Sequence, residues 1–106
     1  MNAIAWAVFV VAALLEVGGD AVIRHGLRSH KLAVVLAGFV TLGCYGLLVN
    51  SLKWDFSRLL GVYVGFFALT SVLAGRFVFR ETIPWSAWCG LGLIAAGCAV
   101  IQYSRP

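Results

Sequence analysis

Two carboxylic acids lie inside the first long apolar segment of the sequence, and they are the residues best suited to chemistry. Glu16 stands about two thirds of the way along this segment, and Asp20 follows four residues later. A carboxylate at membrane depth costs several kcal/mol, so such residues normally face a bundle interior or a water-filled cavity and belong to proton or ion pathways. Glu16 is therefore the leading functional candidate.

The spacing of the charged residues favours a shared site. Glu16, Asp20 and Arg24 follow one another at steps of four residues, which places them on one face of a helix together with Ala12 and Gly19. The small neighbours leave room for a ligand. A carboxyl group that holds either a proton or a cation, but not both, suffices for exchange. Two alternatives stay open: Glu16 forms a structural interhelical hydrogen bond, and Asp20 simply pairs with Arg24.

Aromatic side chains are candidates for the other half of a cation site, because a desolvated cation gains about 2 kcal/mol over a ring face. Tyr63 is favoured, since a phenol deep in an apolar segment needs a hydrogen-bonding partner such as Glu16. Alternatively, Tyr63 is a core residue bonded to a backbone carbonyl. Asn50 is a further candidate for the proton and substrate site, and it either bonds across helices or caps one. The remaining aromatic candidates are Trp6, Tyr45 and Phe66.

These residues must be positioned by membrane-spanning helices. The chain of 106 residues is 62% hydrophobic and 11% charged, whereas soluble domains are about one quarter charged. Four segments reach the roughly 20 apolar residues that span the hydrocarbon core as a helix, and Pro84 separates the last two. We expect a single all-α transmembrane domain over 1–106, with helices near 3–23, 32–52, 59–79 and 85–103.

Charge near the segment ends gives a weak orientation signal. Five of the lysines and arginines fall in the first and third loops and three fall in the second loop and the C-terminal tail. The bias is small enough to allow insertion in both orientations. Four helices are few to enclose a substrate path, and a dimer of oppositely inserted copies would supply the inverted symmetry that transporters use.

Other classes of function find no support in the sequence. The net charge of +4 comes from basic residues in short breaks between apolar runs, not from a stripe that would bind nucleic acid. No nucleophile with a neighbouring base, no metal-ligand spacing and no phosphate-binding loop is present. We therefore expect no enzyme activity, no catalytic residues, no metal and no cofactor.

Three stretches resemble the small multidrug resistance family of the drug/metabolite transporter superfamily. They are LLEVGGDAVIRHGL, SRLLGVYVGFF and GLGLIAAGCAVI. The resemblance implies that Glu16 is the shared proton and substrate carboxylate, that Arg24 is the basic residue eight positions later, and that Tyr63 and Trp6 line the site. It also implies a helix-four dimer surface built from Gly90, Gly92, Ala96 and Gly97.

The resemblance further implies an antiparallel homodimer, or a pair of homologues, that exports guanidinium or quaternary ammonium compounds against protons across the plasma (inner) membrane. Three positions depart from the family pattern: Phe66 replaces a tryptophan, Gly19 stands where guanidinium exporters have a tryptophan, and Asp20 is usually neutral. The run GVYVGFFALTSVLAGRFVF also resembles a second group of small four-span membrane proteins of the same superfamily.

Our first hypothesis is a proton-coupled antiporter of small organic cations. A flippase subunit for a polyprenyl-linked lipid is the first alternative, in which the loop RHGLRSHK binds phosphate headgroups. A non-transporting membrane partner, in which Glu16 is structural, is the second.

Overall fold

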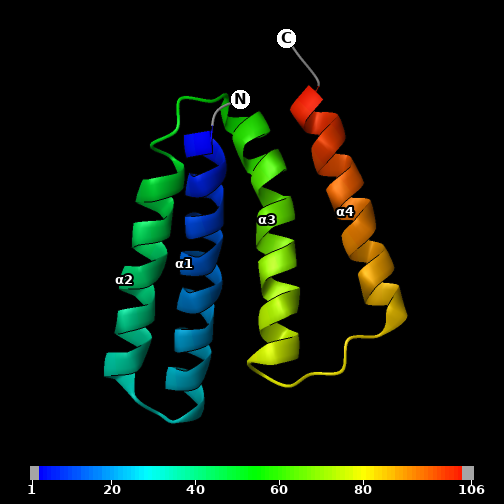
Figure 1. Cartoon of the computed structure of the whole chain (residues 1–106). Coiled ribbons are helices and arrows are strands. Elements are labelled where there is room, and N and C mark those ends of the chain that lie inside the picture. Colours follow the sequence, from blue (N-terminus) through cyan, green and yellow to red (C-terminus); the bar gives the residue numbers. More distant parts are fainter. Residues whose placement is uncertain (1–2, 104–106) are drawn as a thin grey trace. The chain divides into compact units, whose positions relative to one another are not determined.

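The computed structural model describes residues 3–103, and this part of the chain is all helical, with no strand. Four helices follow one another: α1 (Ala3–Arg28), α2 (Leu32–Val49), α3 (Phe56–Phe77) and α4 (Trp85–Tyr103). Figure 1 shows them joined by short loops. Each is long and apolar enough to cross a membrane. The predicted four-span, all-α fold class is confirmed.

The first helix continues beyond the apolar segment that predicted it. We expected an end near residue 23, but α1 extends to Arg28. Its last turn is closed by Ser29, whose backbone N–H and hydroxyl both donate to the His25 carbonyl, at 3.0 and 2.7 Å. His30 then adopts the left-handed conformation, with φ of 56°, and reverses the chain.

The second helix ends earlier than its apolar run. It ends at Val49, where the backbone changes to i→i−3 hydrogen bonds: the Ser51 N–H donates to the Leu48 carbonyl at 3.2 Å. At this end the Asn50 side-chain Nδ2 donates to the Gly46 carbonyl at 2.9 Å. This supports the capping interpretation of Asn50. The third helix begins at Phe56, three residues before its predicted start, and ends at Phe77. The fourth has the predicted bounds.

The chain divides into two compact units, residues 1–53 and 54–106. Each described part is an antiparallel helical hairpin. In the first hairpin, glycines allow α1 and α2 to approach closely. A Cβ atom added to Gly19 would lie 2.8 Å from Leu42 Cδ2, and one added to Gly26 would lie 2.7 Å from Val35 Cγ2. Both glycines are buried, as expected for the small residues that bring membrane helices together.

In the second hairpin, a GxxxG pair on α3, Gly61 and Gly65, allows α3 and α4 to approach closely. A Cβ added to Gly61 would lie 2.9 Å from Ile101, and one added to Gly65 would lie 2.9 Å from the sulfur of Cys98. The Cys98 thiol also donates to the Gly61 carbonyl at 3.2 Å. Gly61 and Gly65 therefore pack α3 against α4 within one chain.

Gly38 marks the tightest point of the first hairpin and gives a stability prediction. Its added Cβ would collide with Ile23 Cγ1 and lie 3.0 Å from the Gly19 carbonyl oxygen. Overpacking of this kind costs about 1–3 kcal/mol, so we expect Gly38→Ala to lower the thermal unfolding midpoint in detergent. Gly43 has nothing within 4 Å of its added Cβ, and Gly43→Ala should leave the midpoint unchanged or slightly higher. Equal midpoints for the two variants would contradict this packing.

Candidate functional site

The contacts between α1 and α2 fix the register of the first hairpin. Gly26 lies against Val35, Gly38 against Ile23, and Gly19 against Leu42. Each step towards the start of α1 is thus matched by an equal step towards the end of α2. The facing residues recur every three or four positions on both helices, which is the spacing of one helix face.

One turn beyond the Gly19 and Leu42 pair, the same register places Glu16 opposite Tyr45. The next level holds Ala12 and Val49, both fully buried. Glu16 and Tyr45 are each half-buried. They form a single polar layer in an otherwise apolar seam between two helices.

The depth of Glu16 is greater than the sequence indicated. Because α1 runs from Ala3 to Arg28, Glu16 stands at its middle, about 20 Å from its first residue and about 18 Å from its last at 1.5 Å per residue. Ala12 and Ala13 before it and Gly19 after it are buried on the same face. The carboxyl group therefore projects from the packed side of the helix, beside residues with small side chains.

Tyr45 interacts electrostatically with Glu16. The sequence favoured Tyr63 as the partner of the carboxyl, with Tyr45 among the further candidates. The signal that favours Tyr45 is present in the sequence as two equally spaced faces, Ala12, Glu16 and Gly19 on one segment and Leu42, Tyr45 and Val49 on the next. The pairing of these two faces can be inferred only when the position of the turn between the helices is known.

The other candidates of α1 lie before and after the layer of Glu16 and Tyr45 along the helix. Trp6 is half-buried, and its ring packs against Phe9 with centroids 5.9 Å apart. Asp20 and Arg24 are exposed on the surface of the chain. Both charged groups therefore lie at the surface of a candidate spanning helix.

Tyr63 and Phe66 belong to the second hairpin. Tyr63 is only 3% exposed, and its ring lies 6.5 Å from that of Phe67. Phe66 is half-buried. The role of both as lining residues of a cation site stays a prediction.

The fourth helix contributes no buried residue. Gly90, Gly92 and Gly97 have open space where a Cβ would stand, and Gly92, Ala96 and Gly97 are exposed. The small-residue surface predicted for dimer contact is therefore uncovered in the single chain. Across residues 3–103, no cluster of three or more metal-ligating side chains occurs, and the three cysteines are free thiols.

Comparison with known proteins agrees with a small membrane protein. The family model described as "Uncharacterised BCR, YnfA/UPF0060 family" matches residues 3–105. A UPF0060 membrane protein of Rhodococcus erythropolis is 44% identical, over 92% of each chain, and one of Nocardia farcinica is 36% identical, over 91% of this chain and 88% of the relative. A UPF0060 membrane protein of Pseudomonas aeruginosa is 31% identical, over 90% of this chain and 89% of the relative.

No solved structure matches the chain. The small multidrug resistance family is not among these matches, so the resemblance to it stays a basis for expectations about function. The family match and the four apolar helices make the chain a multi-pass membrane protein. The chain belongs to the YnfA/UPF0060 family.

Proposed function

We propose that the protein is a transporter, not an enzyme, and that it exchanges protons for small organic cations of the guanidinium or quaternary ammonium type. The observation that carries this proposal is the layer of Glu16 and Tyr45 at the middle of α1. A membrane-embedded carboxyl is costly and normally serves a proton or ion pathway. The plasma membrane is the proposed location, because only an energised membrane supplies the proton gradient.

Coupling arises from competition at one carboxyl group. A protonated Glu16 has no net charge to attract a cation, and a cation bound to the carboxylate disfavours the proton. The small residues around Glu16 leave space for the ligand, and the Tyr45 hydroxyl can donate a hydrogen bond to the carboxylate or turn towards the ligand. One site that alternates between two occupants then exchanges them without a second binding site.

The experiment is to reconstitute the purified protein in liposomes and record substrate-induced currents on a solid-supported membrane. Guanidinium, alkylguanidines and tetraalkylammonium ions are tested at several pH values. We expect currents whose size depends on the pH difference across the membrane. If folded protein gives no current with any of these cations, the proposal is contradicted and the lipid-carrier alternative is favoured.

We further propose that the working unit is a dimer of two copies, or of this chain and a homologue, inserted in opposite orientations. The exposed small-residue surface of α4 supports this, because such surfaces allow two helices to approach closely in a bilayer. Opposite insertion of two four-helix chains would create the inverted symmetry on which alternating access depends.

Gly92→Ile tests the dimer surface. The added side chain has open space within the chain, so the monomer should fold, while a partner helix would be pushed away. We expect the dimer to weaken by about tenfold, equivalent to about 1.4 kcal/mol. The dimer fraction is measured by light scattering during size-exclusion chromatography in detergent. Gly43→Ile, at an equally open position of α2, is the matched control, and equal weakening by both variants would contradict the assignment to α4.

A further inference from the structure

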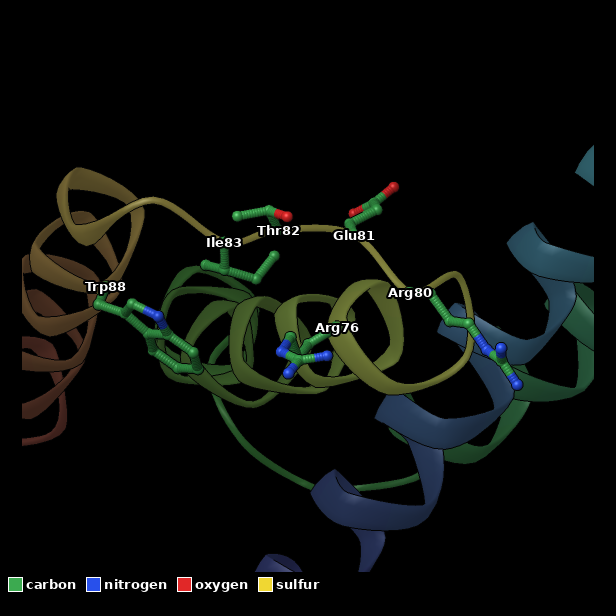
Figure 2. Close-up of a pocket in the computed structure, with 6 residues that line it drawn as sticks. All are labelled: Arg76, Arg80, Glu81, Thr82, Ile83 and Trp88. Carbon is green, nitrogen blue, oxygen red and sulfur yellow. The ribbon is translucent and has the colours of Figure 1, made fainter.

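A pocket of about 240 Å³ lies in the second hairpin where α3 turns into α4. Figure 2 shows the residues that line it: Arg76, Arg80, Glu81, Thr82, Ile83 and Trp88. The Arg76 guanidinium and the Trp88 indole lie on one side of the loop, and Arg80 extends away from them. Glu16 belongs to the first hairpin and is not among the residues that line this pocket.

The charges that line the pocket are not neutralised by pairing. Within residues 3–103, neither Arg76 nor Arg80 forms an ion pair, and Glu81 forms none either. The Arg76 guanidinium instead lies 5.5 Å from the centroid of the Phe77 ring. Two guanidinium groups and one carboxylate leave the pocket with a net positive charge, which suits an anion of one negative charge.

The loop that carries these residues has a defined conformation. The backbone N–H of Phe79 donates to the Ala74 carbonyl at 3.1 Å, and that of Glu81 donates to the Gly75 carbonyl at 2.9 Å. Arg80, between them, adopts the left-handed conformation with φ of 56°, which is unfavourable for a residue with a long side chain and uncommon outside glycine and asparagine. The loop folds back over Gly75, where an added Cβ would lie about 2.5 Å from Glu81 Oε1.

The pocket lies where two candidate spans end, so we expect it at the depth of the lipid headgroups. Arg76 is in the last turn of α3, which is a candidate span, and Trp88 is in the first turn of α4, which is another. Tryptophan is enriched at membrane interfaces, and a guanidinium group binds phosphate oxygens through two parallel hydrogen bonds. An anion that reaches this depth is most readily a phosphate attached to a lipid.

We propose that this pocket binds the phosphodiester of a phospholipid headgroup. Arg76 holds the phosphate, Arg80 supplies a second positive charge at the edge of the pocket, and the Trp88 indole packs against the glycerol region. A lipid bound here fixes the turn between α3 and α4 at the membrane surface. The proposal is independent of transport and of Glu16.

The test is the thermal unfolding midpoint of the purified, delipidated protein in a neutral detergent. Phosphatidylglycerol, diacylglycerol of the same chain length and inorganic phosphate are added separately. We expect phosphatidylglycerol to raise the midpoint by about 5 °C, and diacylglycerol and inorganic phosphate to leave it unchanged. Native mass spectrometry of the same samples should show one retained phospholipid per chain.

Variants separate this site from general surface charge. Arg76→Gln and Arg80→Gln change exposed residues, so both should fold, and we expect each to lose most of the midpoint shift and the retained lipid. Lys53→Gln, at an exposed position between α2 and α3, is the matched control and should keep both. Equal loss in the control, or no loss in either pocket variant, would overturn the proposal. An equal shift with inorganic phosphate would overturn the lipid as the ligand.

Discussion

Replacing Glu16 with glutamine is expected to reduce cation-induced currents to the level of protein-free liposomes. Glutamine keeps the size and hydrogen-bonding capacity of the side chain but can neither release a proton nor attract a cation by charge. The loss should be complete because every copy of the variant lacks the Glu16 carboxyl group on which the proposed exchange depends. Transport currents of wild type and variant, at matched amounts of protein in the liposomes, measure the effect.

Two controls make this result specific. Asp55→Asn removes another carboxylate, at the exposed position before α3 where the side chain forms no capping hydrogen bond, and it should transport like the wild type. The thermal unfolding midpoint of Glu16→Gln should stay close to that of the wild type. If Glu16→Gln no longer folds, the alternative in which Glu16 is structural is supported. If Glu16→Gln folds and keeps its transport currents, the proposed mechanism is contradicted.

Tyr45→Phe is expected to weaken cation binding by about tenfold without abolishing transport. The substitution removes the hydroxyl group and keeps the ring. In the proposed site this hydroxyl donates one hydrogen bond to the charged Glu16, and such a bond is worth about 1.5–3 kcal/mol. The apparent affinity for the cation, from the concentration dependence of the currents, should fall while the direction of coupling to protons is kept.

Tyr103→Phe is the matched control for this change. Tyr103 is the last residue of α4 and is 82% exposed, so loss of its hydroxyl should leave the apparent affinity unchanged. An unchanged affinity in Tyr45→Phe would contradict the role of Tyr45 in the site. A large effect of Tyr63→Phe in the same assay would support the sequence-based choice of Tyr63 as a lining residue.

The number and type of the helices could be predicted from the sequence because apolar length alone decides whether a segment spans a membrane. The ends of the helices could not be predicted in the same way. α1 extends five residues beyond its apolar segment because helical backbone hydrogen bonds do not require apolar side chains, and the helix ends only at the turn of Ser29 and His30. α2 is shorter because its backbone changes to i→i−3 hydrogen bonds after Val49, where the Asn50 side chain caps the Gly46 carbonyl.

Some of the functional residues could likewise be predicted from the sequence, and others could not. Glu16 could be found from sequence, because a carboxyl group inside an apolar segment is rare whatever the fold. The sequence favoured Tyr63 and not Tyr45 as its partner. The position of Tyr45 opposite Glu16 depends on the register of α1 and α2, which is set by the turn at Ser29 and His30. The pocket around Arg76 was not predicted, since it forms only when the loop after α3 folds back over Gly75.

The most direct test of the central claim is to measure proton release when a cation binds to the purified protein in weakly buffered detergent solution. If Glu16 holds either a proton or a cation, adding a tetraalkylammonium or guanidinium compound near the pH at which the carboxyl is protonated should release protons in proportion to the bound ligand. Glu16→Gln should release none, and Asp55→Asn should match the wild type. Cation binding without proton release, or proton release that persists in Glu16→Gln, would contradict the account.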